Sequence, residues 1–382
     1  MRYQPADIFF IAGEASGDLQ ASLLSRALQA VRPGTHVAGV GGDALAASGA
    51  QLAYHSPEIA SIGPLSVIPM LPRLYAVYLW LDRSLRRQPP ALLTPVDAGG
   101  FNIPLLRRLR RRGYRGKALY YFPPGAWVDN ARQARAVADL TMPLTAFAHQ
   151  RDFYRSLDLR IEYFGHPLVS VISPRTQPPP AVRPHIAVLP GSRHEEVVRH
   201  VPVLARAAAL LEARCGARFT LVASSAARAR QIRSLWPRRG GPGSADVVRT
   251  NTIDALRTVT LAWVASGTAV LEAALSAVPQ VAFYTVSHAQ YRIAQRKLPA
   301  QLMRTITLPN LVMQRMILPE LLQHDFTAQN LTEQTLGLLG DDQRMNAQLA
   351  ACADLRNSLG PPDALQHIAR FVAHYMNGDD RP

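Results

Sequence analysis

The chain has 382 residues, 48% of them hydrophobic, so it can bury large cores and is more typical of two domains than of one. Its two cysteines, Cys215 and Cys352, are far apart, which excludes a disulfide framework or a cysteine-rich metal site and fits a reducing compartment. A short apolar run at residues 8–12 follows the first seven residues, and we expect a buried strand there rather than a signal peptide.

The net charge of +15 raises the question of a nucleic-acid partner. Almost all the basic residues are arginines, which an arginine-rich proteome would also explain, and they are densest at residues 106–117. No aromatic-interleaved RNA motif, zinc finger or basic zipper accompanies this cluster. We therefore expect no nucleic-acid binding, and an anionic lipid or a phosphorylated substrate is at least as good a partner for such a surface.

Short apolar strands alternate with helical stretches in the first half of the chain. Strands are predicted at residues 8–12, 36–40, 91–94 and 118–121, and helices at residues 19–31 and 105–112. This alternation is typical of a doubly wound parallel sheet. In such a sheet the ligand site lies beyond the carboxyl ends of the strands.

A proline-rich segment at residues 173–184 interrupts this pattern and predicts a stiff, extended linker. A second alternating series follows, with strands at 185–189, 219–223, 261–264 and 280–284 and helices at 195–215 and 226–235. The predicted fold class is therefore α/β, with two Rossmann-like doubly wound domains that face a central cleft. The predicted domains are residues 1–172 and 185–345, joined by the linker at 173–184 and followed by a helical tail at 346–382.

The segment at residues 59–81 is largely apolar and long enough to suggest a membrane span. Three prolines, Pro64, Pro69 and Pro72, argue against one spanning helix, because each removes a backbone hydrogen bond that lipid cannot replace. The segment either packs in a core or forms an interfacial patch that dips into lipid, an interpretation that its aromatic residues and the arginine cluster favour. The predicted patch consists of Ile62, Leu65, Val67, Ile68, Met70, Leu71 and Trp80.

Residues 190–193, Pro-Gly-Ser-Arg, end a predicted strand and precede a helix that opens with an acidic pair. Such a junction leaves backbone N–H groups unpaired and directed at one spot, which suits a phosphate bound near Gly191 and Ser192. Arg193 adds a permanent positive charge with a planar set of donors. The alternative is an ordinary capped turn with Arg193 in solvent.

Two further polar junctions follow predicted strands in the first half. The run Gly13-Glu14-Ala15-Ser16-Gly17-Asp18 lies between the first strand and the first helix, where its glycines and serine permit close backbone approach, although a tight turn is the alternative. Asp97 follows the strand at 91–94, and a lone carboxylate that faces the cleft could accept a proton from a sugar hydroxyl. A helix-capping aspartate is the alternative interpretation of Asp97.

In the second half, Ser266, Gly267 and Thr268 come directly after the strand at 261–264 and open a helix. The N–H groups of its first turn and the two hydroxyl groups could hold a diphosphate, and Glu272, one turn further, could hold the two hydroxyl groups of a ribose. A simple N-cap would explain either hydroxyl but not the whole run. We expect no metal site, because the sequence has no Asp-x-Asp, no His-x-x-x-His and no clustered cysteines.

In combination, these residues resemble the lipid-A-disaccharide synthase family, which are two-domain glycosyltransferases of the GT-B architecture. The shared motifs run in family order over nearly the whole chain, and their combination is specific although no single one is. In the first half they are 13–18, Asp97 with Phe101-Asn102, Phe153-Tyr154 and Gly165-His166. In the second half they are 189–193 with Glu196-Val197, 265–269 with Leu271-Glu272, Leu308-Pro309-Asn310 and 319–323.

The resemblance implies that UDP-2,3-diacylglucosamine reacts with 2,3-diacylglucosamine 1-phosphate, with inversion, to release UDP and form a β-1,6-linked disaccharide. It also implies a peripheral protein on the cytoplasmic face of the inner membrane that needs no metal or other cofactor. On the family pattern, Asp97 would be the general base on the acceptor hydroxyl, and Arg193 would stabilise the negative charge on departing UDP. The oligomeric state is left open, with a homodimer as one alternative.

The same pattern divides the site residues between the two substrates. The residues expected to bind UDP are Gly191, Ser192, Arg193, Ser266, Gly267, Thr268, Glu272 and Asn310. The residues expected on the acceptor side of the cleft are Gly13, Glu14, Ser16, Gly17, Asp18 and Asn102.

The chain departs from the family pattern at several positions. Gly100 replaces the second aspartate of the family's Asp-x-x-Asp-Phe-Asn run, and Ser66 and Gln150 replace usual glutamates. The tryptophan-rich loop of the family is Trp127-Val128-Asp129-Asn130 here, and Thr285 replaces an arginine or lysine. Most departures lie in the acceptor half, so the sequence specifies the donor nucleotide better than the acceptor and its acyl chains.

Two kinds of alternative function remain at this point. One is a UDP-sugar transferase or epimerase of the same fold with another substrate. The other is a basic membrane-binding or nucleic-acid-binding protein that has lost catalysis. The retained Asp97 and Arg193 argue against a loss of catalysis, and the missing RNA motifs argue against nucleic acid.

Overall fold

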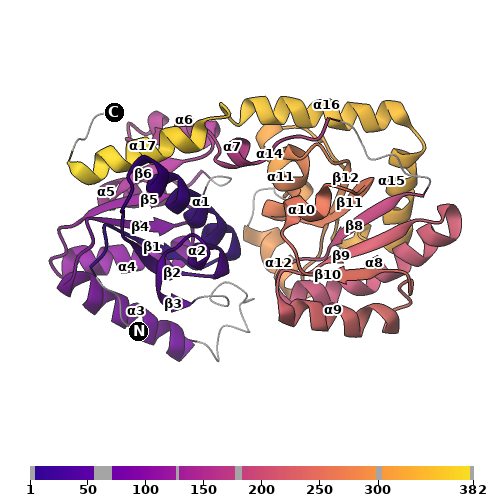
Figure 1. Ribbon diagram of the computed structural model, residues 1–382, viewed down its shortest axis with the longest axis horizontal. Helices are drawn as coiled ribbons and strands as arrows, with labels where there is room; N and C mark the ends of the chain where they lie inside the picture. Colours follow the sequence, from indigo (N-terminus) through magenta and orange to yellow (C-terminus); the bar gives the residue numbers. More distant parts are fainter. Residues whose placement is uncertain (1–4, 56–70, 126–128, 177–182, 298–302, 379–382) are drawn as a thin grey trace. The chain divides into compact units, whose positions relative to one another are not determined.

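A computed structural model describes residues 5–55, 71–125, 129–176, 183–297 and 303–378 of the chain. The chain divides into two compact units, residues 1–170 with 359–382 (unit 1) and residues 171–358 (unit 2) (Figure 1). Both units are α/β with parallel sheets, so the predicted pair of doubly wound domains is confirmed. The cleft expected between them stays a prediction.

The sheet of unit 1 has seven parallel strands in the order β3-β2-β1-β4-β5-β6-β7. The order reverses between β1 and β4, which makes this the switch point where a doubly wound sheet binds its ligand. Apolar residues occupy both faces of its central strands, because helices cover both sides. The strands are β1 (Ile8–Ala12), β2 (Val37–Gly41), β3 (Gln51–His55), β4 (Leu92–Val96), β5 (Lys117–Tyr121), β6 (Met142–Thr145) and β7 (Glu162–Tyr163).

Each face of this sheet has its own hydrophobic core. Side chains alternate along β1, so Phe10 packs on one side with Leu24 and Ile368, and Phe9 packs on the other with Leu81. The helices of unit 1 are α1 (Ala15–Val31), α2 (Asp43–Ala46), α3 (Leu71–Arg87), α4 (Gly99–Arg111), α5 (Ala131–Leu140), α6 (Ala148–Ser156), α7 (Leu168–Val171) and α17 (Ala364–Asn377).

Unit 2 repeats the arrangement with six parallel strands in the order β10-β9-β8-β11-β12-β13, and its switch point lies between β8 and β11. The strands are β8 (His185–Leu189), β9 (Arg218–Val222), β10 (Asp246–Val248), β11 (Leu261–Ala265), β12 (Gln280–Tyr284) and β13 (Glu320–Leu322). The helices are α8 (His194–Cys215), α9 (Ala226–Arg238), α10 (Thr252–Leu256), α11 (Thr268–Leu275), α12 (His288–Lys297), α14 (Leu308–Met313), the 3-10 helix η2 (Gln323–Asp325), α15 (Ala328–Leu339) and α16 (Asp342–Ser358).

The predicted helical tail at 346–382 is not one element. Its first part is α16, which packs against α11, α14 and α15 of unit 2. Its second part, α17, belongs to unit 1 and packs on α1. The reason is an apolar face on α17, where Ile368, Phe371 and Val372 are buried in the core of unit 1.

The described part of the apolar segment is the helix α3. Val77, Leu81 and Leu85 are fully buried in the core of unit 1, and Trp80 packs against the same core, whereas Tyr75 is 60% exposed. Core packing therefore explains this part of the segment, including Trp80. Five residues of the predicted membrane patch (Ile62, Leu65, Val67, Ile68 and Met70) lie outside the described residues, as does the side chain of Leu71. Among the helices that the structure describes, none is long and apolar enough to cross a membrane.

Candidate active site

In unit 1, the polar junctions predicted after the first and third strands meet at the switch point. Strands β1 and β4 are parallel neighbours, and Ala12 pairs with Val96 at their carboxyl ends. The next residues, Gly13 and Asp97, therefore leave the sheet side by side, with Glu14 one residue further on. The structure thus brings the carboxylates of Glu14 and Asp97 to one edge of one sheet.

The backbone of Asp97 has an unusual conformation that several hydrogen bonds hold in place. Asp97 and Ala98 have φ angles of 44° and 45°, in the left-handed region that costs a residue with a side chain about 1–3 kcal/mol. The carbonyl oxygen of Asp97 accepts hydrogen bonds from Asn102 Nδ2 at 2.9 Å and from Tyr120 Oη at 2.7 Å. Its N–H donates to the carbonyl oxygen of Tyr121 at 3.1 Å. Strain retained by surrounding bonds is typical of functional residues.

Burial and charge together change the acidity of Asp97. Burial raises its pKa, the nearby carboxylate of Glu14 raises it further, and the N–H of Ala98 opposes them, with a result of about 6. A carboxylate with this pKa is ionised at neutral pH but holds a proton better than an exposed aspartate does. This property suits a general base.

Three of the predicted acceptor-side residues have structural roles. The helix α1 begins at Ala15 rather than at residue 19, so Ser16, Gly17 and Asp18 lie in its first turn and not in a loop before it. Asp18 is buried, and its carboxylate accepts hydrogen bonds from the N–H groups of Gly42 at 2.6 Å, Ala44 and Leu45. Asp18 therefore caps α2.

The other two structural residues lie against β4. Gly17 is buried, and a Cβ there would be 3.5 Å from Val96 Cγ1, an ordinary contact distance, so Gly17 is part of the packing of α1 on this strand. Asn102 is buried and supports the turn at Asp97 through its amide. These residues shape the site, which leaves Glu14, Ser16 and Asp97 as the partly exposed polar side chains of the junction.

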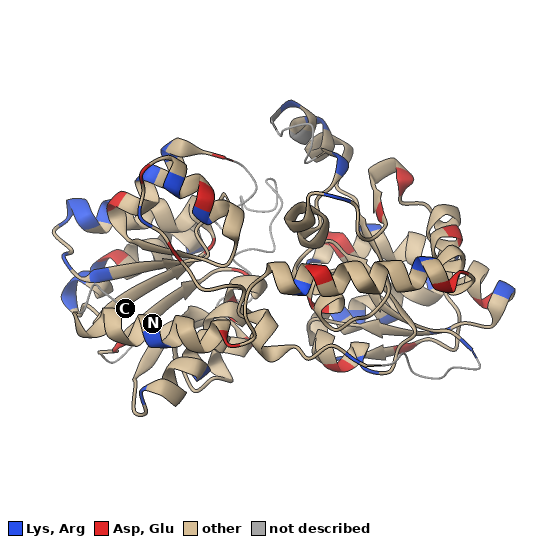
Figure 2. Cartoon of the chain, turned by 90° about the horizontal axis from the view of Figure 1, so that it is seen from above, with Lys and Arg blue, Asp and Glu red and all other residues tan. Residues whose placement is uncertain are grey.

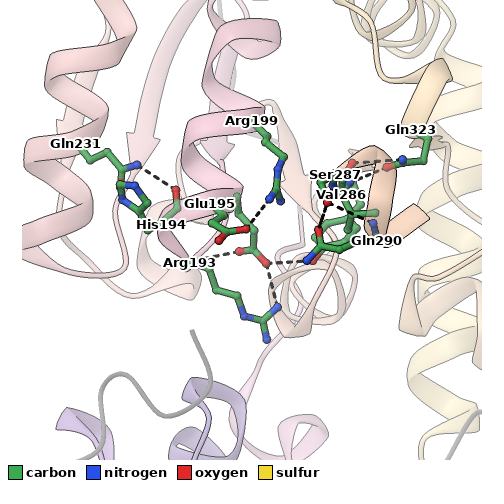
Figure 3. Close-up of polar contacts among 11 residues, drawn as sticks. Arg193, His194, Glu195, Arg199, Gln231, Val286, Ser287, Gln290 and Gln323 are labelled. Atoms are coloured by element: carbon green, nitrogen blue, oxygen red, sulfur yellow. Dashed lines mark hydrogen bonds and ion pairs between the residues drawn. The ribbon is translucent and has the colours of Figure 1, made fainter. Parts of the chain in front are cut away.

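In unit 2, three loops meet at the second switch point. Leu189 at the end of β8 is in register with Val264 of β11, and Ala265 of β11 is in register with Phe283 of β12. The loops that begin at residues 190, 266 and 285 therefore lie together at the carboxyl edge of the sheet. Figure 3 shows this region, with Arg193 at the start of α8 and Ser287 to Gln290 beside it.

At the head of α8, part of the prediction is wrong. The N–H groups of Ser192 and Arg193 were expected to be unpaired, but both donate to Glu196 Oε2, at 3.0 and 3.1 Å. The carboxylate of Glu196 thus occupies the position where a phosphate was expected, because a glutamate three residues into a helix can reach back to its start. The guanidinium of Arg193 also pairs with Glu196, with Nη1 3.0 Å from Oε1, and the Arg193 side chain is 39% exposed.

The start of α11 keeps the features predicted for a diphosphate site. Helix α11 begins at Thr268 after Gly267, so no side chain at the N-cap position covers the first turn, in which the N–H of Val270 donates to the carbonyl oxygen of Gly267 at 3.2 Å. Ser266 lies beside this turn and its hydroxyl reaches the carbonyl oxygen of Ile306 at 3.5 Å. Glu272 is buried one turn further along, where burial raises its pKa and a hydrogen bond with Thr252 opposes that effect.

Asn310 lies inside unit 2 with both ends of its amide occupied. Its Oδ1 accepts hydrogen bonds from the N–H groups of Ile317 at 2.7 Å and Leu318 at 3.2 Å, and its Nδ2 donates to Leu318 and Glu320. Asn310 therefore shapes the loop before β13, and its predicted contact with UDP stays a prediction.

The structure shows the surroundings of three departures from the family pattern, Gln150, Gly100 and Asp129. Gln150 is buried and bonds to Thr145 Oγ1 at 2.6 Å and to the carbonyl oxygen of Pro123 at 2.9 Å, so an amide satisfies this interior position. Gly100 and Asp129 are exposed, and a Cβ on Gly100 would touch nothing within 4 Å. Ser66 and residues 126–128 lie outside the described residues.

Three residues without a predicted role also contact the junctions: Tyr120 in unit 1, and Tyr284 and His200 in unit 2. Tyr120 is the next-to-last residue of β5, Tyr284 ends β12, and His200 lies in the second turn of α8. Their side chains are buried or half-buried. In the sequence they are therefore not distinguished from ordinary core residues, and no motif marks them as part of a site. Within the described ranges, no group of three or more His, Cys, Asp or Glu side chains could hold a metal ion. Independence of a metal stays a prediction.

Comparison with known proteins identifies the family. The family model described as lipid-A-disaccharide synthetase matches residues 8–368. The chain belongs to this family. The lipid-A-disaccharide synthase of Anaeromyxobacter dehalogenans (strain 2CP-C) is 32% identical, with 98% of this chain and 100% of the relative covered. That of Thiobacillus denitrificans is 33% identical, with 96% of this chain and 99% of the relative covered.

Solved structures support the fold of this family member. The UDP-GlcNAc 2-epimerase of Neisseria meningitidis, solved bound to UDP-GlcNAc, aligns with a TM-score of 0.63 and 11% identity over 96% of this chain and 99% of its own. The calicheamicin glycosyltransferase aligns with a TM-score of 0.57 and 15% identity over 99% and 100%. These likenesses confirm the GT-B fold. Lipid-A-disaccharide synthases are glycosyltransferases, so membership of the family also confirms the predicted enzyme class.

Proposed function

We propose that the chain transfers 2,3-diacylglucosamine from UDP to 2,3-diacylglucosamine 1-phosphate, forming a β-1,6 bond and releasing UDP. Membership of the lipid-A-disaccharide synthetase family supports this reaction. The observation that carries the proposed chemistry is Asp97, a half-buried carboxylate on a strained backbone, with a pKa of about 6, at the switch point of unit 1. Such a group has the position and the acidity that a general base needs.

In the proposed step, Asp97 takes the proton of the acceptor hydroxyl as its oxygen attacks the anomeric carbon of the donor sugar. The bond from that carbon to UDP breaks, and its electron pair leaves on the diphosphate. Because attack and departure occur on opposite faces of the carbon, the reaction inverts its configuration. Glu14 raises the pKa of Asp97, so it helps the base to keep the proton.

The proposed donor site lies in unit 2. The first turn of α11, with Ser266, Gly267 and Thr268, supplies N–H and hydroxyl donors for the diphosphate. Arg193 supplies the positive charge that stabilises departing UDP, the type of electrostatic effect that is usually largest in such sites. Glu272 is proposed to bind the ribose hydroxyl groups. The acceptor chemistry is thus proposed for unit 1 and the donor chemistry for unit 2.

A direct assay tests this function. The purified chain is incubated with both lipid substrates in detergent, and UDP and disaccharide are followed by mass spectrometry. We expect disaccharide and UDP in equal amounts, and at least about 100-fold lower turnover for Asp97→Ala and for Arg193→Ala. Asp139→Ala and Arg230→Ala, exposed positions on α5 and α9, serve as controls. Failure of the folded enzyme to form disaccharide from the two lipid substrates would contradict the proposal and would favour another acceptor or an epimerase.

We also propose that the chain binds the anionic surface of the cytoplasmic face of the inner membrane through α3 and α4. The Lys and Arg positions of the chain are marked in Figure 2. Three of them, Arg107, Arg108 and Arg111, line a hollow of about 300 Å³ together with Tyr78 and Pro104, and no carboxylate is part of this lining. Arginines next to an exposed aromatic residue, Tyr75, suit a lipid headgroup region.

Vesicle sedimentation tests the membrane surface. Replacing Arg107 and Arg111 together by glutamine should weaken binding to anionic vesicles by about 30-fold, since each of the two charges near such a surface contributes about 1 kcal/mol. The control, Arg238 and Arg239 replaced together by glutamine, removes the same charge from exposed positions of unit 2. Equal binding by both double variants would contradict this surface. Whether the chain forms a homodimer stays open to measurement of its mass in solution.

A further inference from the structure

Glu196 is the centre of the hydrogen-bond network at the head of α8. Its carboxylate is almost fully buried, and both oxygens are used: Oε2 accepts from the N–H groups of Ser192 and Arg193, and Oε1 pairs with the Arg193 guanidinium. One carboxylate therefore fixes both the backbone and the side chain of Arg193.

A tyrosine from β12, two strands away from β8 in the sheet, holds Glu196 in turn. Tyr284, at the end of β12, donates its hydroxyl hydrogen to Glu196 Oε1 at 3.2 Å. Burial raises the pKa of Tyr284, and the charge of Glu196 raises it further, so this hydroxyl stays protonated and remains a donor. His200 forms a second link between the loop after β8 and the loop after β12. Its Nδ1 lies 2.8 Å from the carbonyl oxygen of Pro190, and its Nε2 accepts a hydrogen bond from the N–H of Thr285 at 3.3 Å. Burial lowers the pKa of His200, which keeps this ring neutral.

Gly191 makes the arrangement possible. Its φ is +111°, and a Cβ there would lie 2.5 Å from Glu196 Oε2, closer than real Cβ contacts allow. The loop can fold over the carboxylate only with glycine at this position. The network is therefore built into the backbone as well as into the side chains.

A negative charge beside a site for departing diphosphate is unfavourable in itself, so its presence needs a reason. An arginine side chain that is 39% exposed has many rotamers, and ordering it during the reaction costs free energy. A carboxylate that fixes the guanidinium beforehand removes much of this cost. The electrostatic penalty is limited, because Glu196 is already neutralised by Arg193 and by three further donors.

We propose that Glu196 is the positioning residue for Arg193 and that Tyr284 anchors Glu196. The proposal rests on the role proposed for Arg193 at departing UDP. Glu196 does not touch the substrate. It sets the guanidinium at the carboxyl edge of β8, where the loops after β11 and β12 also end.

The test is a double-mutant cycle with a matched control. Glu196→Gln keeps the size of the side chain but loses the charge, and we expect kcat to fall about 10–100-fold with little change in the KM for the acceptor. Tyr284→Phe should lower kcat about 3–10-fold, since it removes one hydrogen bond to the carboxylate. Glu195→Gln removes the same charge from the same turn of α8, but Glu195 pairs with Arg199, and this variant should keep kcat within about twofold.

Combination with Arg193→Ala separates positioning from a general effect on folding. If Glu196 acts through Arg193, the double variant Arg193→Ala/Glu196→Gln will be no slower than Arg193→Ala alone. If instead the losses of kcat from Arg193→Ala and Glu196→Gln multiply in the double variant, the positioning role is overturned. Equal losses of kcat in Glu195→Gln and Glu196→Gln would overturn it as well. Normal turnover by Arg193→Ala would instead overturn the proposed function of Arg193 itself. Melting temperatures of all variants identify any loss that comes from unfolding.

Discussion

The hydroxyl group of Tyr120 donates a hydrogen bond to the backbone carbonyl oxygen of Asp97, with 2.7 Å between the two oxygens. Tyr120 is fully buried at the end of β5, and Asp97 follows β4, its neighbour in the sheet. The bond therefore ties the strained turn of the proposed base to a rigid strand. A positioned carboxylate, rather than a mobile one, is what a proton transfer requires.

Replacing Tyr120 by phenylalanine should release this turn. We expect kcat to fall about tenfold, because one hydrogen bond of about 1–1.5 kcal/mol to a strained residue is lost. Tyr121→Phe is the matched control: its hydroxyl is buried and has no acceptor among the described residues, so its removal should leave kcat and stability nearly unchanged. Steady-state kinetics and thermal melts of both variants provide the measurement. Similar kinetics in the two variants would show that the bond to Asp97 has no role in turnover.

The pKa of Asp97 predicts the pH dependence of the reaction. A general base must be ionised, so kcat/KM should fall as the pH drops below about 6 and should level off above about 7. Glu14→Gln removes the charge that is the second cause of the raised pKa, and the midpoint of this limb should move to lower pH. The measurement is a pH profile for the wild type and Glu14→Gln. An unchanged midpoint would mean that Glu14 does not tune the base, and a flat profile would argue against Asp97 as the base.

Much of this site could be predicted from the sequence, because short apolar strands followed by polar turns define where a doubly wound sheet binds ligands. Asp97 and Ser266 are predicted after strands and Arg193 in the turn between a strand and a helix, and the structure has them there. The strand at 280–284 was predicted with the bounds that the structure shows, because three of its five residues, Val281, Phe283 and Tyr284, favour strands.

The polar partners inside the site could not be predicted in this way. The glycine-containing turns beside Asp18 and Glu196 resemble ligand-binding turns in the sequence. In the structure, both carboxylates instead accept hydrogen bonds from N–H groups of the chain itself. Only the distances in the fold show which donors a carboxylate satisfies. The return of α17 to unit 1 was also missed, since an apolar helix face does not specify which sheet it covers.

Gly191 offers a test of the loop over Glu196. Gly191→Ala introduces a Cβ that would clash with Glu196 and a side chain in a left-handed backbone, so we expect a loss of kcat similar to that of Glu196→Gln. Gly216→Ala, at the other end of α8, is the matched control. Its φ is also positive, at +65°, but the new Cβ would lie 3.7 Å from the nearest atom, in the side chain of Arg183, which is an ordinary contact. It should lose about 1 kcal/mol of stability and keep its kcat. If Gly216→Ala loses its activity as fully as Gly191→Ala does, backbone strain alone explains the effect at Gly191, and the contact with Glu196 is not needed to explain it.

Asp82 is buried among three arginines and should matter for stability rather than for turnover. It pairs with Arg86, Arg108 and Arg112, whose side chains are 28–48% exposed. Burial by itself would raise the pKa of Asp82, but the hydrogen bonds of the arginines outweigh it and hold the pKa below the ordinary 3.8. A folded pKa below the unfolded one gives stability that is present above about pH 4 and is lost as the pH falls further.

Asp82→Ala leaves the three guanidinium groups without this carboxylate. We expect the free energy of unfolding at neutral pH to fall by about 2 kcal/mol, at the low end for a buried pair because solvent screens the exposed arginines. The variant should also lose less stability than the wild type does when the pH is lowered from about 5 to 3, since the titrating group is gone. Urea unfolding at several pH values measures both effects, and Asp139→Ala controls for the change in charge. Parallel curves of stability against pH for Asp82→Ala and the wild type would show that the arginines do not stabilise the ionised form of Asp82.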